Sequence, residues 1–355
     1  MEQEGKEITM EEKTRGKRKA YYVLAGIVSV LLVLFIGVYY TLTSLNRTGT
    51  EIVDGEAVLP PEEELESIEG TPEDIDEDYI YEVKDPESEA IYRKIPIDEN
   101  VFNVLLVGSD VRGDEEGNGR SDSMMLVSYN RETSDIRIVS FMRDTWIAIP
   151  NREWNRINAA YAFGGIGLAV NTVNENFELD IQNYAIVEFE GLKSIVDTLG
   201  GIEVKLTTAE IRKINSAGAG DRIPLEEGTY VLNGDQVLVH SRNRSTGDGD
   251  FGRTRRQRDV MTGILGKMKE TLNPVKLTTF ITESLKYVDT NMKADTLFTL
   301  GLEVLGSGSS DLSQARVPFD DTWSYANKGG RSVVTIDLEE NRRLLYEYLY
   351  GEKND

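Results

Sequence analysis

LLVGSDVRGDEEGNGRSD, residues 105–122, is an apolar run that stops at Gly108 and gives way to carboxylates and arginines. The run indicates a buried strand, and polar groups that directly follow such a strand are often functional. The carboxylates of Asp110 and Asp122 suit a hard divalent cation. An arginine such as Arg120 suits phosphate, because its guanidinium group binds two oxygens at once. The stretch therefore predicts a phosphate and metal site at the end of a strand.

The chain that follows alternates strand-like and helix-like runs. Strands are predicted at 102–107, 124–129, 136–141, 184–189, 202–206, 315–318 and 333–336. Helices are predicted at 159–177, 189–199, 256–272, 275–288, 294–305 and 338–350. Strands mixed with helices favour an α/β or α+β fold in which helices cover a sheet. Because no repeat or second linker interrupts this part, one domain is predicted over residues 101–355.

The first predicted helix is unusually apolar, since residues 159–170 read AAYAFGGIGLAV. A helix that is apolar on every side is typical of a buried core element. The alternative is a wall of a hydrophobic pocket, because the glycines leave room beside the helix. The residues alone leave both interpretations open.

A second polar cluster occupies residues 240–259, HSRNRSTGDGDFGRTRRQRD. Its arginines are Arg242, Arg244, Arg253, Arg255, Arg256 and Arg258. The first two are two residues apart, as on one face of an extended segment. Arg253, Arg256 and Gln257 are three and four residues apart, so one face of a starting helix would present them to an anion. The alternative is a solvated loop whose aspartates balance its arginines.

A third segment, SFMRDT, places Arg143 and Asp144 directly after another predicted strand. Arg143 is a candidate for a further phosphate contact. The alternative is a structural ion pair between Arg143 and its neighbour Asp144.

The N-terminal region predicts a membrane anchor, because residues 20–46 contain no charged side chain and are almost wholly apolar. Four basic residues lie within 15–19, so the positive-inside rule predicts a cytoplasmic tail over 1–19 and an extracellular remainder. A cleavable signal peptide is the alternative, although no convincing cleavage site follows the apolar run. The uncharged run and its basic flank predict a single-pass protein of the cell membrane.

An acidic, flexible spacer is predicted over residues 47–100, with 19 acidic and 4 basic side chains. This segment carries more than half of the formal net charge of −23. The folded part is therefore only moderately acidic, and nucleic-acid binding is disfavoured because it needs a basic surface.

Cysteine is absent and His240 is the only histidine. Disulfides, thiolate metal sites and polyhistidine metal sites are thereby excluded. The chemistry must depend on carboxylates, arginines and a bound cation.

Several motifs resemble those of the LytR-CpsA-Psr family of cell-wall enzymes, in the same order along the chain. They are LLVGSD (105–110), RSDSMML (120–126), FMRDT (141–145), RINAAYAFGG (156–165), VDTLGGI (196–202), LNGDQVLVHSRNR (232–244) and DFGRTRRQRD (250–259). The resemblance covers the chain from Val101 to its C-terminus. His240 departs from the pattern, since the family usually has tyrosine there, but the neighbouring arginines are intact.

The resemblance implies an α/β/α sandwich around a central mixed sheet. It also implies a phosphotransferase that moves an anionic glycopolymer, such as teichoic acid or capsule, from an undecaprenyl pyrophosphate carrier to peptidoglycan. The acceptor would be the C6 hydroxyl of N-acetylmuramic acid, and the product a phosphodiester.

The same resemblance implies roles for individual residues. Asp110 and Asp122 would bind Mg²⁺, with Mn²⁺ as an alternative. The pyrophosphate would be held by Arg120, Arg143, Arg242, Arg244, Arg253 and Gln257. The catalytic residues would be Arg120, Arg143, Asp250 and Arg253, with Asp250 acting as the base or orienting an arginine. The lipid chain would lie against Ala159, Phe163, Gly167 and Val170.

Two other classes of function remain open from the sequence. A polyprenyl pyrophosphate phosphatase would use the same residues with water as the acceptor. A non-enzymatic binder of polyprenyl phosphate, or a transcriptional attenuator, would need no acceptor. The predicted extracellular site argues against direct control of genes.

Overall fold

The computed structural model describes residues 50–60, 90–109, 121–247, 249–271, 273–306 and 312–351. Its centre is a six-stranded sheet in the order β11-β8-β3-β4-β5-β12. These strands are β3 (Val101–Ser109), β4 (Ser121–Asn130), β5 (Ile136–Phe141), β8 (Asn183–Glu188), β11 (Val288–Asp289) and β12 (Leu312–Val317). The pairs β3/β8 and β5/β12 are parallel and the other neighbours are antiparallel, so the predicted mixed sheet is confirmed.

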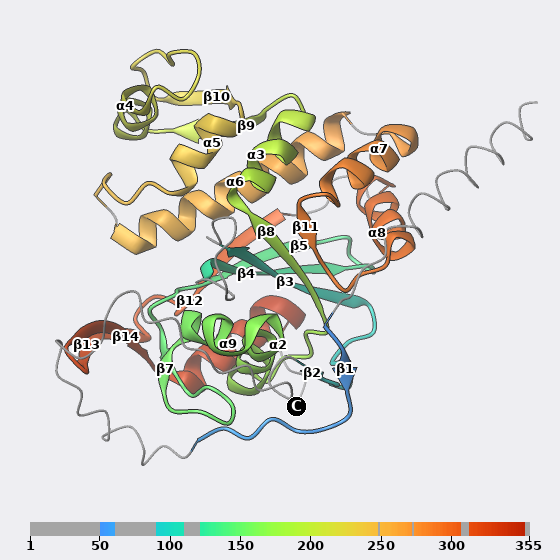
Figure 1. The fold of residues 1–355 in the computed structure, drawn as a ribbon, viewed down its shortest axis with the longest axis vertical. Coiled ribbons are helices and arrows are strands. Elements are labelled where there is room, and N and C mark those ends of the chain that lie inside the picture. Colours follow the sequence, from blue (N-terminus) through green and yellow to red (C-terminus); the bar gives the residue numbers. More distant parts are fainter. Residues whose placement is uncertain are drawn as a thin grey trace, which may run out of the picture. The chain divides into compact units, whose positions relative to one another are not determined.

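Helices cover both faces of this sheet, as Figure 1 shows. One face carries α2 (Ile157–Phe177) and α9 (Leu338–Tyr350). The other carries α3 (Phe189–Thr198), α6 (Gly249–Thr271), α7 (Pro274–Ser284) and α8 (Ala294–Gly306). Successive residues of β4 point to opposite faces of the sheet. Leu126 packs in the core on the α2 and α9 face, and Met125 packs in the core on the α6 and α8 face.

A smaller antiparallel sheet of β9 (Ile202–Leu206) and β10 (Gly228–Leu232) packs beside α6. The helices α4 (Thr208–Ala217) and α5 (Gly234–Ser241) accompany it, and each begins with a capping box. The helix α6 approaches β9 closely at Gly263, where an added Cβ would lie 2.8 Å from the carbonyl oxygen of Glu203.

Three further strand pairs complete the described part. They are β1 (Ile52–Val53) with β2 (Ile91–Tyr92), β6 (Trp146–Ile147) with β7 (Asn155–Arg156), and β13 (Trp323–Lys328) with β14 (Arg331–Ile336). The β13–β14 hairpin is joined to the segment after β5, because Val334 donates its backbone N–H to the carbonyl oxygen of Asp144 at 2.9 Å.

The structure corrects the expected course of two helices. The helix α2 is interrupted at Gly164 and Gly165, and Gly165 has a φ of 60° that side chains disfavour. The helix α6 begins at Gly249 rather than at Arg256, so its first turn carries Asp250. These seven added residues make about two turns, so Arg253 and Arg255 also lie on the helix.

The predicted spacer is structured at both of its ends. Ile91 is fully buried, and Tyr92 donates its backbone N–H to Oδ1 of Asn171 at 3.0 Å. Ile97 donates to Oδ2 of Asp180 at 2.7 Å. Short apolar stretches within the acidic segment therefore contribute to the domain, although its composition predicted a flexible segment throughout.

The predicted cytoplasmic tail and membrane anchor, residues 1–46, lie outside the described residues. Among the residues that the structure describes, no helix has the length and apolar character needed to cross a membrane.

Candidate functional site

Arg143, directly after β5, is the centre of a charged cluster at one end of the sheet. Its Nη1 lies 3.3 Å from Oδ1 of Asp122, and its Nη2 lies 3.4 Å from Oδ2 of Asp250. Its Nε lies 3.6 Å from Oδ2 of Asp144, which also pairs with Arg156 at 2.9 Å. One guanidinium group thus joins β4, the loop after β5 and the start of α6. The ion pair between Arg143 and Asp144, which was the structural alternative, is present. Arg143 also pairs with Asp122 and Asp250.

Arg253 and Asp250 face this cluster from the first turns of α6. Arg253 is 2% exposed, and its Nη2 lies 3.2 Å from Oδ1 of Asp250. Its Nε and Nη1 are buried and find no hydrogen-bond partner among the described residues. Burial, followed by the charge of Arg143, lowers the pKa of Arg253 to about 10. A buried cation with two unused donors is the environment that an anionic ligand would complete.

Asp250 is held in its ionised form. Burial alone opposes ionisation, but Arg253, a hydrogen bond with Asp144 and the charge of Arg143 outweigh it and lower the pKa of Asp250. Its two oxygens contact two different arginines. These contacts favour the role of orienting the arginines over that of accepting a proton.

A pocket of about 710 Å³ adjoins the cluster between β4, α5 and the start of α6. Five of the predicted site residues line it: Asp122, Arg242, Arg244, Arg253 and Gln257. Arg244 lies 3.5 Å from Oδ1 of Asp122, and the Gln257 amide lies 3.5 Å from the Asp122 carbonyl oxygen. Of the five arginines predicted to converge, Arg242, Arg244 and Arg253 line this pocket, whereas Arg143 does not line it and Arg120 lies outside the described residues.

Arg242 is the C-cap of α5 rather than part of an extended segment. Its guanidinium carbon lies 4.4 Å from the centre of the Phe189 ring, as in a cation–π contact. The stacking fixes the side chain at the wall of the pocket, which it lines together with Arg244.

Arg256 does not join the pocket, contrary to the expectation that it shares a face with Arg253. It is buried with Glu210, whose Oε1 lies 3.4 Å from its Nη1, and its Nη2 donates to the carbonyl oxygen of Asn243. Because Asn243 stands between Arg242 and Arg244, this buried pair supports the loop that carries both arginines. Sequence reasoning missed Glu210, although the capping-box spacing from Thr207 was visible.

His240 is buried beside this pair. Burial lowers its pKa to about 4, which the charge of Glu210 only partly offsets, so the ring is neutral at neutral pH. Both of its ring nitrogens are buried and lack a hydrogen-bond partner in the described part of the chain. The departure from tyrosine thus falls in the core behind the arginine loop, outside the pocket lining.

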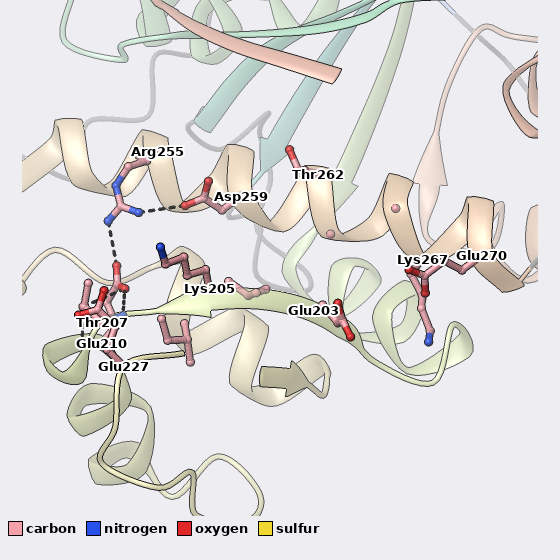
Figure 2. Close-up of a pocket in the computed structure, with 14 residues that line it drawn as sticks. Glu203, Lys205, Thr207, Glu210, Glu227, Arg255, Asp259, Thr262, Lys267 and Glu270 are labelled. Carbon is pink, nitrogen blue, oxygen red and sulfur yellow. Dashed lines mark hydrogen bonds and ion pairs between the residues drawn. The ribbon is translucent and has the colours of Figure 1, made fainter. Parts of the chain in front are cut away.

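A second pocket, of about 600 Å³, lies between β9 and α6. Figure 2 shows that Arg255 bridges Asp259 and Glu210 at one end of it, both at 3.0 Å. Lysines and further glutamates line its length. None of the predicted site residues lines this pocket.

Of the four residues predicted to contact lipid, two are buried in the core and two are half-buried beside it. Val170 belongs to the core cluster on the α2 face of the sheet, and Gly167 is buried in α2. Ala159 and Phe163 pack against a smaller cluster that contains Ile149. None of the four lines either of these two pockets.

Asp110 and Arg120 lie in the segment 110–120, outside the described residues, so their predicted roles stay predictions. Within the described ranges, no group of three or more acidic or histidine side chains could hold a metal ion. The carboxylate of Asp122 is a hard oxygen donor beside the arginines, as an Mg²⁺ ligand would be, but it would need Asp110 to complete the site.

Comparisons with known proteins agree with the resemblance seen in the motifs. The sequence model of the LytR_cpsA_psr family matches residues 70–345. The chain is 30% identical to the regulatory protein MsrR of Staphylococcus aureus over 249 residues, which is 70% of this chain and 74% of that protein. It is 34% identical to the teichoic acid transferase TagU of Bacillus cereus over 219 residues, or 61% and 69% of the two chains.

Solved structures of TagT have the same fold. TagT bound to LI-WTA superposes with a TM-score of 0.60 at 24% identity, covering 72% of this chain and 94% of that one. TagT with bound octaprenyl pyrophosphate gives a TM-score of 0.55 at 23% identity, with coverage of 72% and 93%. With the family model spanning most of the domain and MsrR covered over two thirds of its length, this chain belongs to the LytR-CpsA-Psr family.

Proposed function

We propose that this protein transfers an anionic glycopolymer from an undecaprenyl pyrophosphate carrier to the C6 hydroxyl of N-acetylmuramic acid in peptidoglycan. The observation that carries the proposal is the buried guanidinium of Arg253, with two unused donors, at a pocket that Arg242 and Arg244 also line. The naming of TagU as a teichoic acid transferase, and the pyrophosphate lipid bound to TagT, support it at the level of the family.

Phosphoryl transfer needs positioned charge more than a covalent intermediate. The arginines of the pocket would bind the pyrophosphate oxygens and stabilise the charge that moves toward the departing lipid phosphate. Ionised Asp250 contacts both Arg143 and Arg253 and so orients them toward the pyrophosphate. Arginine suits it better than lysine, because each guanidinium group binds two oxygens in a fixed plane.

We propose that Asp110 and Asp122 hold Mg²⁺, or Mn²⁺ in its place, next to the pyrophosphate. The bound cation would supply further neutralisation of the pyrophosphate charge. Asp122 already contacts Arg143 and Arg244 through the same oxygen, so it stands where the phosphate would meet both. We expect activity to depend on Mg²⁺ and to be lost in Asp122→Asn, which keeps the shape of the side chain but removes its charge.

The transfer reaction is tested with the full-length protein, a radiolabelled lipid-linked glycopolymer and peptidoglycan. The proposed function predicts label on the peptidoglycan in wild type and none in Asp122→Asn at any Mg²⁺ concentration. Release of the polymer as a free phosphate, equal with and without peptidoglycan, would instead identify a phosphatase. Tight binding without turnover would identify a binder or regulator.

We propose a path for the lipid chain that differs from the one predicted along α2. The residues Arg253, Gln257, Met261 and Leu265 succeed each other every four residues on α6, so one side of the helix runs from the pocket to the apolar layer under α8. The helix α8 is apolar, yet it has no fully buried residue. We propose that the polyprenyl chain follows α6 and covers the half-buried side chains of α8, such as Leu300.

Leu300→Asp should therefore reduce the polyprenyl lipid that co-purifies with the protein, as measured by mass spectrometry of the extract. Leu302 is exposed on the same helix, so Leu302→Asp is the matched control and should retain the lipid. Equal amounts of lipid in both variants would contradict this path.

The carrier lipid and the growing wall meet at the outer surface of the membrane, and we propose that the domain lies there. The uncharged stretch 20–46 and its basic flank support a single-pass anchor with its N-terminus in the cytoplasm. Protease added to intact protoplasts should digest the domain. Complete protection would contradict this orientation.

A further inference from the structure

We propose that Phe251, Trp323 and Tyr325 form an aromatic platform that binds the sugar rings of the peptidoglycan acceptor and leads them to the charged cluster. This inference rests on the proposed function, since it assigns the acceptor of that reaction. Of the three, Phe251 belongs to α6 and the other two to β13.

The three rings form a continuous series. The ring centres of Phe251 and Trp323 are 4.6 Å apart, and those of Trp323 and Tyr325 are 5.1 Å apart with an interplanar angle of 82°. Arg316 stands over the Phe251 ring at 4.6 Å and closes the series on one side. At the other end, the Tyr325 side chain is 65% exposed. An aromatic side chain left in water at the end of a packed row is available for a ligand.

The platform is attached to the candidate site at two points. Phe251 follows Asp250 in the first turn of α6. Tyr325 is the cross-strand partner of Val334, which in turn donates its backbone N–H to the carbonyl oxygen of Asp144. Both Asp144 and Asp250 contact Arg143. The hairpin therefore holds the exposed ring at a fixed position relative to the cluster.

The chemistry of the rings suits a glycan. The faces of a pyranose ring that carry axial C–H groups are apolar, and they are attracted to the negatively charged face of an aromatic ring. Tyrosine and tryptophan also present a polar group at the ring edge, which can bond a sugar hydroxyl or acetamide. A row of such rings suits consecutive sugars of one strand better than a single small molecule.

The position favours the acceptor over the donor. The donor pyrophosphate would occupy the pocket that Arg242, Arg244 and Arg253 line, and none of the three aromatic residues lines that pocket. The platform begins at Phe251, the residue that follows Asp250 in the first turn of α6. A hydroxyl that attacks the phosphate must approach from outside the pocket, so a sugar strand on the platform would bring its hydroxyl groups to the cluster.

The test is a titration of the full-length protein with soluble, uncross-linked peptidoglycan fragments of four sugars, followed by tryptophan fluorescence. Tyr325→Ala should weaken binding about five- to tenfold, which corresponds to the loss of one ring contact. Tyr325→Phe should retain most of the affinity. Tyr287 is also an exposed tyrosine, remote in sequence from the hairpin, so Tyr287→Ala is the matched control and should bind as wild type does.

A second variant, Trp323→Ala, should abolish the fluorescence change, and the exposed position of Tyr325 keeps the test decisive if that variant fails to fold. In the transfer reaction, Tyr325→Ala should raise the KM for peptidoglycan and leave the KM for the lipid donor unchanged. Equal affinity of Tyr325→Ala, Tyr287→Ala and wild type for the fragments would overturn the platform, and so would a rise in the KM for the donor alone. Fragment binding that depends on Tyr325 in a protein without transfer activity would support the platform and contradict only the proposed function.

Discussion

Arg143→Ala should lower the turnover of glycopolymer transfer by about a hundredfold or more. The substitution removes three contacts at once, to Asp122, Asp144 and Asp250, and leaves three carboxylates facing the position where a pyrophosphate must bind. One charge-assisted hydrogen bond contributes roughly 1.5–3 kcal/mol, which corresponds to about ten- to a hundredfold in rate. Initial rates at saturating donor measure the effect.

Arg143→Lys should not restore the activity, because a single ammonium group cannot reach three carboxylates in one plane. The control is Arg131→Ala, which breaks an exposed pair with Glu303 away from the pocket and should leave the rate unchanged. Turnover within a factor of about two of wild type in Arg143→Lys would show that only the charge at this position matters.

Glu210→Ala should lower the free energy of unfolding by about 3–5 kcal/mol, as is typical when one partner of a buried ion pair is removed. The Arg256 side chain is 1% exposed, so its charge would remain in the interior after the loss of the Glu210 carboxylate. Hydrogen bonds from Thr207 and Arg255 now hold the pKa of Glu210 below its ordinary value against the effect of burial, so the carboxylate is ionised. Urea denaturation followed by circular dichroism measures the loss.

The matched control is Glu303→Ala, which removes the other half of the surface pair with Arg131 and should cost no more than about 1 kcal/mol. If Glu210→Ala were as stable as Glu303→Ala, the ion pair between Glu210 and Arg256 would contribute nothing to the stability of the fold. Since Arg256 also bonds the backbone before Arg244, the Glu210 variant should lose activity even below its melting temperature.

The sequence predicted the central sheet well because its strands are long, apolar and bounded by polar turns. Leu105 and Ile138 are both fully buried, as the apolar composition of their runs implied, although alternate residues of β3 are only half-buried. The helices α4 and α5 were missed because they are short and largely polar, although the pairs Thr207 with Glu210 and Asn233 with Gln236 are visible capping-box spacings. The β13–β14 hairpin was half missed, since its first strand reads WSYANK and lacks an apolar alternation.

The candidate site could be assembled from the sequence only in part. Residues that follow strands, such as Arg143, were placed correctly because strand ends share one edge of a sheet. Arg253 and Arg256 could not be separated, because they lie three residues apart on α6 and only the tertiary contact of Arg256 with Glu210 distinguishes the core from the pocket. The prediction that lipid contacts α2 rested on apolar composition alone, which does not distinguish a solid core from a layer that is only half buried.

The close approach of α6 to β9 at Gly263 sets a limit on how this sequence can vary. A methyl group there would meet the carbonyl oxygen of Glu203 at 2.8 Å, so the helix would have to lift. Helices are stiff, and Arg253 lies ten residues, or about 15 Å, along the same axis, so the lift would displace it from Asp250. An added Cβ at Gly266, three residues on, meets nothing within 4 Å. Among natural variants of this chain, we therefore expect glycine to persist at 263, although that position has no part in the chemistry, while other residues replace Gly266.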